Sequence, residues 1–120
     1  MSSIYLHIPF CKKRCTYCNF FSTTQIQVQD QYVDALLKEI DIRKDYISNP
    51  TTIYLGGGTP STLSLTHLEK IFVSLEKNFN LTNVEEVTIE CNPDDLNIDY
   101  IRGFKNLPIN RLSMGIQTFN

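Results

Sequence analysis

Three cysteines lie close together near the start of the chain and are its most distinctive chemical feature. Cys11, Cys15 and Cys18 follow the spacing CxxxCxxC, whereas the fourth cysteine, Cys91, stands alone. Thiolates are soft ligands that suit iron–sulfur clusters and zinc. A structural zinc ion takes four ligands, so three clustered thiolates leave one coordination position open. An open position is typical of a metal centre that binds a substrate or performs chemistry.

Two other uses of these cysteines stay open from the residues alone. A closed zinc site needs a fourth ligand, but His7 lies back on a predicted strand and Cys91 falls on the other side of the sheet by residue alternation. A redox pair of Cys15 and Cys18 is a further alternative, although it leaves Cys11 without a role. The spacing favours a cluster over both.

A glycine run follows in the middle of the chain. Gly56, Gly57 and Gly58 precede Thr59 and Pro60. Missing side chains let the backbone approach a ligand closely and hydrogen-bond its polar groups. A tight turn before a helix is the structural alternative. A phosphate-binding P-loop is disfavoured because its lysine is absent.

The elements that must position these loops alternate between strands and helices. Period-two alternation predicts strands at Ser3–Ile8, Thr51–Leu55, Glu86–Glu90 and Arg111–Met114. Period-3.6 patterns predict helices over Asp30 to about Ile47, about Ser64–Phe79 and about Asp99–Lys105. Asn49 and Pro50 are predicted to stop the first helix, and Thr66 with Glu69 could form a capping box in the second. His67 reads as a surface residue.

This order of elements predicts an α/β fold with a parallel sheet, because no two-residue hairpin joins the strands. Such a chain is either a small open sheet or the first part of a (β/α)₈-type barrel, which needs about 250 residues when complete. The sequence stops just past a predicted strand that lacks a covering helix. We therefore expect residues 1–120 to be the N-terminal portion of one truncated barrel domain, with about four strands and three helices.

The two faces of the predicted sheet differ in character. One face is apolar and suits packing against helices; it holds Ile4, Leu6, Ile8, Ile53, Leu55, Val87, Ile89, Cys91, Leu112, Met114 and Ile116. The other face is polar on every strand; it holds Tyr5, His7, Tyr54, Gly56, Thr88, Glu90, Arg111, Ser113, Gly115 and Gln117. A polar face can be solvated or can line a lumen. The lumen is favoured because of four residues that lie at or near the C-terminal strand ends, where such folds bind ligands, namely Tyr5, Gly56, Glu90 and Gln117.

The bulk composition excludes several classes of protein. A formal net charge of −2 and 42% hydrophobic residues are ordinary values for a globular protein, and they give no sign of nucleic-acid binding. Apolar stretches are far shorter than the roughly 20 residues that span a bilayer. The first ten residues contain no lysine or arginine, which disfavours a secretory signal. We expect a reducing, cytoplasmic location in which the cysteines are thiols or ligands.

Five motifs, taken in order, resemble the oxygen-independent coproporphyrinogen III oxidase family of the radical S-adenosylmethionine (SAM) superfamily. They are Tyr5-Leu-His-Ile-Pro-Phe-Cys11, the CxxxCxxC loop, Gly56-Gly-Gly-Thr-Pro60, Glu90-Cys-Asn-Pro93 and Arg111-Leu-Ser-Met-Gly-Ile-Gln117. The resemblance covers essentially the whole chain, which would be the first third or so of such a protein.

The resemblance implies cofactors and residue roles. Cys11, Cys15 and Cys18 would bind a [4Fe–4S] cluster whose fourth iron is chelated by SAM, the source of a 5′-deoxyadenosyl radical. The glycine run, with Gly57, Gly58 and Thr59, would hold the methionine part of SAM. The remaining contacts to SAM or substrate would come from Tyr5, Tyr17, Glu90 and Gln117. Tyr17 has a plain loop-packing alternative, and lumen packing is the alternative for Tyr5, Glu90 and Gln117.

One departure from the family pattern bears on the activity. The coproporphyrinogen oxidases typically carry a further cysteine two positions after the third ligand, and this chain has Phe20 there. The difference favours the closely related haem chaperones, which bind haem and deliver it to an acceptor protein. Oxidative decarboxylation of coproporphyrinogen III is the alternative, and a zinc-binding structural module is the distant third. Either of the first two would need an electron donor and would handle haem or a porphyrinogen.

Overall fold

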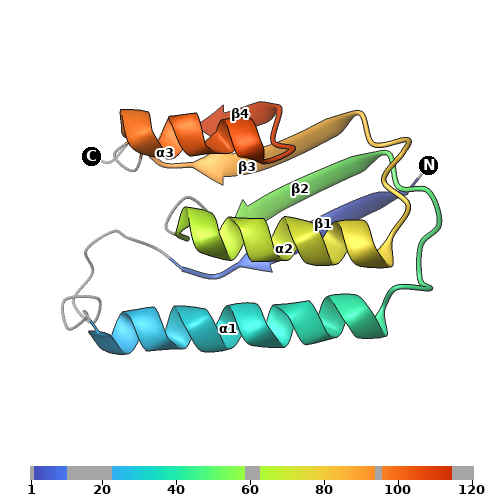
Figure 1. Ribbon diagram of the computed structural model, residues 1–120, viewed down its shortest axis with the longest axis horizontal. Coiled ribbons are helices and arrows are strands. Elements are labelled where there is room, and N and C mark those ends of the chain that lie inside the picture. Colours follow the sequence, from blue (N-terminus) through green and yellow to red (C-terminus); the bar gives the residue numbers. More distant parts are fainter. Residues whose placement is uncertain (1, 11–22, 59–62, 94–95, 115–120) are drawn as a thin grey trace, which may run out of the picture.

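The computed structural model of the chain describes residues 2–10, 23–58, 63–93 and 96–114. Strands and helices alternate along it (Figure 1). The strands are β1 (Ser3–Ile8), β2 (Thr52–Gly57), β3 (Glu86–Cys91) and β4 (Arg111–Met114). The helices are α1 (Thr23–Ile42), α2 (Leu65–Asn78) and α3 (Ile98–Gly103), the last extended by a 3₁₀ turn at Phe104–Asn106. The predicted α/β class and its sequence of elements are confirmed.

The strands form one parallel sheet in the order β1-β2-β3-β4. Sequential parallel neighbours are the arrangement expected of consecutive β/α units in a barrel wall. The register aligns Tyr5 with Tyr54 and Ile53 with Val87. All three helices lie on the same side of the sheet (Figure 1), so its other face is left to the polar side chains.

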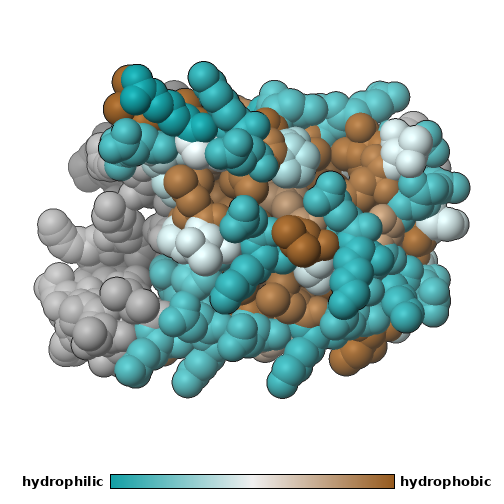
Figure 2. Space-filling view, in the orientation of Figure 1, coloured by the Kyte–Doolittle hydropathy of each residue, from teal (hydrophilic) through white to brown (hydrophobic). Residues whose placement is uncertain are grey.

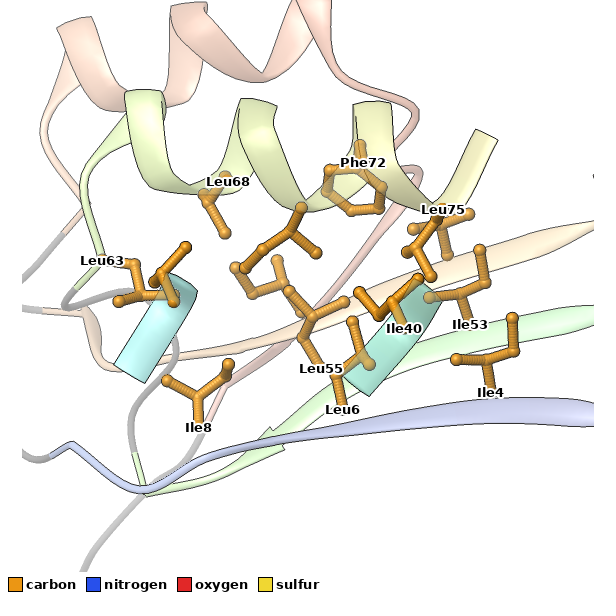
Figure 3. Close-up of a cluster of buried hydrophobic side chains, with 14 of the residues drawn as sticks. Ile4, Leu6, Ile8, Ile40, Ile53, Leu55, Leu63, Leu68, Phe72 and Leu75 are labelled. Carbon is orange, nitrogen blue, oxygen red and sulfur yellow. The ribbon is translucent and has the colours of Figure 1, made fainter. Parts of the chain in front are cut away.

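The core lies between this sheet and α1 and α2, as the side chains of Figure 3 show. Its fully buried residues come from the predicted apolar face and from the inward stripe of α2; they include Ile8, Ile53, Leu55, Ile89, Leu68, Ile71, Phe72 and Leu75. The helical surface seen in Figure 2 is mostly hydrophilic, with hydrophobic residues between the helices. Leu112 and Met114, predicted to share the apolar face, are 37% and 46% exposed because the described residues place no further strand beyond β4.

The boundaries of the first helix differ from those predicted. It begins at Thr23 rather than Asp30 and ends at Ile42 rather than near Ile47. The residues before Asp30 are rich in polar side chains, so they lack the apolar period that would have revealed them. Beyond Ile42 the chain turns, with the Tyr46 amide bonded to the Arg43 carbonyl. Ile47 still packs on the core after this turn, which is why it extended the apparent helical pattern.

The start of α2 corrects two further expectations. Ser64, not Thr66, is the N-cap, and its hydroxyl accepts a hydrogen bond from the His67 amide. His67 is not a surface residue: it is 8% exposed, and its Nε2 lies 2.5 Å from Oδ1 of Asp30 on α1. This contact joins two residues that are 37 positions apart and lie on different helices. Local sequence patterns do not predict such a pairing. Among the described residues, no helix is long and apolar enough to cross a membrane.

Candidate functional site

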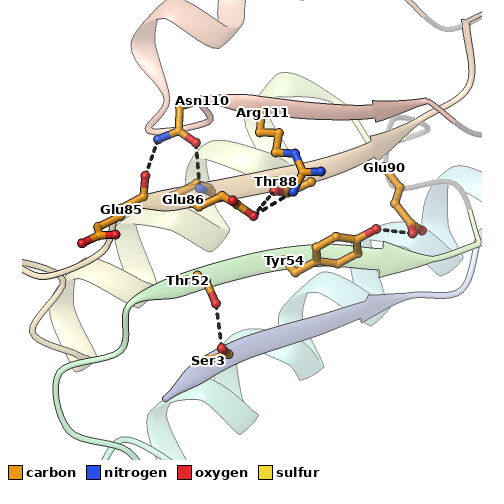
Figure 4. A network of polar contacts seen from close by, with 10 residues as sticks. Ser3, Thr52, Tyr54, Glu85, Glu86, Thr88, Glu90, Asn110 and Arg111 are labelled. Carbon is orange, nitrogen blue, oxygen red and sulfur yellow. Dashed lines mark hydrogen bonds and ion pairs between the residues drawn. The ribbon is translucent and has the colours of Figure 1, made fainter. Parts of the chain in front are cut away.

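Side chains from three neighbouring strands meet on the polar face of the sheet. The register places Tyr5 of β1 beside Tyr54 of β2, and their rings stack with centroids 6.0 Å apart and planes 17° from parallel. The Tyr54 hydroxyl donates a hydrogen bond to Oε2 of Glu90 on β3, at 2.5 Å (Figure 4). The row therefore runs across the sheet towards its C-terminal edge and ends in a carboxylate.

The same carboxylate also binds the backbone of the glycine run. Oε1 of Glu90 accepts a hydrogen bond from the Gly57 amide at 3.1 Å. Gly57 has a φ of 109°, a conformation that residues with a side chain rarely adopt. The His7 ring lies against Gly57, and the Tyr5 hydroxyl is 3.3 Å from Nδ1 of His7. Glu90 thus fixes a left-handed turn at the C-terminal end of β2.

The glycine turn is attached to the segment that leads into the cysteine motif. The Gly58 amide donates to the Ile8 carbonyl at 2.8 Å. A Cβ added to Gly58 would lie 2.5 Å from the carbonyl oxygen of Phe10, which directly precedes Cys11. A Cβ on Gly56 would lie 2.7 Å from the Tyr54 ring. Close packing within the fold therefore explains why these positions are occupied by glycine. The argument that the turn binds a ligand depends instead on the polar groups around it.

The opposite end of the sheet carries polar contacts of a different kind (Figure 4). The Asn110 side chain accepts from the Val87 amide and donates to the Glu85 carbonyl, and Arg111 pairs with Glu86 at 2.9 Å. These bonds tie the start of β3 to the entry of β4. These polar groups find their partners within the protein, so we assign a structural role to this end of the sheet.

A groove of about 410 Å³ runs between β1 and α1. Tyr5 and His7 line part of it, together with Tyr32, Glu39 and Arg43 of the helix side. Its lining does not include Glu90 or the glycine turn. The groove therefore follows the packing of α1 along β1 and is distinct from the carboxylate site.

The ionisation of Tyr54 gives a pH-dependent prediction. The hydrogen bond to Glu90, followed by partial burial, raises the pKa of Tyr54 above its ordinary value of 10.0. A raised tyrosine pKa means that folding favours the neutral phenol, so this stabilisation is complete below pH 10 and is lost as the pH rises through the raised pKa. We expect Tyr54→Phe to lower the free energy of unfolding by about 1 kcal/mol near neutral pH. Urea denaturation should show that difference from wild type shrinking above pH 10, and a constant difference would contradict the assignment.

The structure brings together four of the residues predicted for the site, namely Tyr5, Gly57, Gly58 and Glu90. The others lie outside the described residues; they are Cys11, Cys15, Tyr17, Cys18, Thr59 and Gln117. Sequence reasoning placed Tyr54 and His7 on the polar face but assigned neither of them to the site. Both fall on the polar face by strand alternation, and that alternation is the sequence feature that could have indicated them as site residues.

The position of Cys91 agrees with the prediction from alternation. It is 2% exposed on the helix-facing side of β3, and its thiol lies 3.6 Å from the Ile89 carbonyl oxygen. The adjacent Glu90 points to the other face, towards Tyr54 (Figure 4). Within the described ranges, no group of three or more histidine, cysteine or acidic residues could hold a metal ion.

Comparison with known proteins identifies the family of the chain. The model of the radical SAM superfamily matches residues 5–120. The chain is 40% identical over 120 residues to the protein named heme chaperone HemW of Lactococcus lactis, covering 99% of this chain and 31% of that protein. It is 37% identical over 122 residues to oxygen-independent coproporphyrinogen III oxidase of Salmonella typhimurium, covering 98% and 27%.

A solved structure shows the same fold. Coproporphyrinogen III oxidase (HemN) from Escherichia coli, a radical SAM enzyme, superposes with a TM-score of 0.80 at 37% identity, over 98% of this chain and 28% of that one. The chain spans about a third of the length of the curated relatives that it matches. Proteins of this superfamily generally use a [4Fe–4S] cluster and SAM. With its parallel β/α units, its glycine turn and its match from residue 5 to residue 120, the chain belongs to the radical SAM superfamily.

Proposed function

We propose that the protein is a haem chaperone that binds a [4Fe–4S] cluster on Cys11, Cys15 and Cys18 and SAM on the polar face of its sheet. The observation that carries the SAM site is the Glu90 carboxylate, held at the C-terminal edge of the sheet beside a glycine turn. That turn is bonded to Ile8, three residues before the first cysteine. A ligand that touches both the cluster and Glu90 would therefore lie across this edge.

The described residues fit the polar groups of SAM. Among the described residues, each Glu90 oxygen accepts one hydrogen bond, which leaves a second lone pair for a ribose hydroxyl or an ammonium group. Gly57 and Gly58 are exposed and present backbone at the turn, where Thr59 follows. Tyr5 is 55% exposed, so its ring can face a bound ligand. By resemblance, Tyr17 and Gln117 would complete the contacts.

When bound, the cluster and SAM together supply one-electron radical chemistry, and the protein contributes orientation and exclusion of water. Thiolate ligands require a reducing compartment, which supports a cytoplasmic location. The wider set of partners would be haem, an electron donor and a haem acceptor protein.

The choice of haem transfer over enzymatic turnover comes from Phe20, which stands where the resembling oxidases carry a further cysteine. Two of the relatives with the highest similarity bear the name heme chaperone HemW, in Buchnera aphidicola and Lactococcus lactis. The oxidase activity is the second candidate, because relatives with that name match at 37% identity. A closed zinc module is a distant third.

One experiment separates these functions. The protein from the complete gene is produced, reconstituted without oxygen using iron and sulfide, and assayed for haem binding, haem transfer and coproporphyrinogen III turnover. We expect a brown [4Fe–4S] chromophore, haem binding and transfer to an acceptor, without turnover. Turnover in the absence of haem binding would refute the chaperone function, and stoichiometric zinc without a chromophore would refute the cluster.

A further inference from the structure

We propose that Tyr54 is a positioning residue of the SAM site, because its phenol holds the Glu90 carboxylate in the orientation that receives the ligand. This inference rests on the proposed function and adds a residue to it. Tyr54 itself need not touch SAM; it acts through Glu90.

Tyr54 is well placed for this role because it lies on the strand between the other two members of the row. Its ring stacks on Tyr5 of β1, which restricts the plane of the ring. Its hydroxyl bonds Glu90 of β3 on the other side. The position of the donor is thus fixed by two strand pairings and by one stacking contact, all formed before any ligand binds.

The loss of the Tyr54 hydroxyl should affect Glu90 because few hydrogen bonds hold its carboxylate in place. A glutamate side chain has several rotatable bonds, and ordering it costs conformational entropy. Here the carboxylate is held twice, by Tyr54 on Oε2 and by the Gly57 amide on Oε1. Without the phenol, only the bond from the Gly57 amide to Oε1 would remain. Binding would then have to order the carboxylate, and that cost weakens affinity.

Tyr54 also supports the turn itself. A Cβ on Gly56 would come within 2.7 Å of the Tyr54 ring and 3.1 Å of Oε1 of Glu90. The ring, the carboxylate and the start of the glycine run therefore pack directly against one another. One aromatic side chain consequently contacts the carboxylate that is proposed to bind SAM and lies against the residue that begins the glycine run.

The test uses Tyr54→Phe in the reconstituted protein from the complete gene. This change keeps the stacked ring and removes only the hydroxyl. We expect the cluster absorbance to be unchanged and the affinity for SAM, measured by anaerobic equilibrium dialysis, to fall about tenfold. In a Glu90→Gln background, the same change should have little further effect, because Tyr54 acts through that carboxylate.

The matched control is Tyr100→Phe, which removes a hydroxyl of α3 that donates to the Leu63 carbonyl at 2.7 Å, on the helix-covered side of the sheet (Figure 1). It should lower thermal stability while leaving SAM affinity at the wild-type value. Equal affinity for wild type and Tyr54→Phe would overturn the positioning role, and so would an undiminished effect of Tyr54→Phe in the Glu90→Gln protein. If wild type itself binds no SAM, the proposed function fails, and that outcome is read from the wild-type measurement alone.

Discussion

Replacing any one of Cys11, Cys15 or Cys18 with alanine should abolish the brown chromophore of the anaerobically reconstituted protein. A cubane cluster held by three thiolates loses a third of its protein ligands when one is removed, and cysteine thiolates are what hold such clusters in the protein. The measurement is the visible absorbance of the chromophore together with the iron and sulfide content per chain. We expect all three variants to fall to the level of unreconstituted protein.

Cys91→Ala is the matched control for this experiment. Cys91 is buried on the helix-facing side of β3, away from the face that carries Glu90 and the glycine turn. The chromophore and iron content should therefore match those of wild type. A chromophore that requires Cys91, or one that survives the loss of Cys15, would contradict the proposed ligand set.

The second large effect is expected in the core, for Phe72→Ala. Phe72 is 2% exposed and projects from α2 towards the sheet, beside Leu75 (Figure 3). Truncating a buried phenylalanine leaves a cavity and costs about 3–5 kcal/mol, a large part of the roughly 5–15 kcal/mol that stabilises a typical domain. We expect a lower denaturation midpoint in urea with an unchanged slope for the native transition.

Val73 offers a neighbouring control, because it is 58% exposed on the outer side of the same helix. Val73→Ala removes apolar atoms and raises helix propensity slightly, so the free energy of unfolding should change by less than about 0.5 kcal/mol. Equal losses for Phe72→Ala and Val73→Ala would show that α2 does not pack on the sheet through the face assigned to it.

The sequence was sufficient for those features that depend on local periodicity. Alternation placed Ile53 and Leu55 in the core and Glu90 on the opposite face, because successive strand residues point to opposite sides whatever the tertiary fold. It also placed Cys91 on the helix-facing side. The glycine run was identified from its composition, and Gly57 indeed adopts a positive φ.

The remaining features arise from contacts between distant elements. The hydrogen bond between Tyr54 and Glu90 depends on the register of β2 against β3, and that register cannot be predicted from local sequence patterns. The burial of His67 depends on Asp30 of another helix, and the early start of α1 at Thr23 has no apolar period to mark it. The roles of Cys11, Cys15 and Cys18 lie outside the described residues and stay predictions.

The hydrogen bond from Gly58 to Ile8 has a consequence for the geometry of the whole site. It fixes the spacing between the turn proposed to hold the ligand and the root of the segment that carries the cysteines. Only Pro9 and Phe10 separate that anchor from Cys11 in the sequence. One backbone hydrogen bond, donated by Gly58, thereby joins the turn proposed to bind SAM to the strand that leads into the proposed cluster ligands.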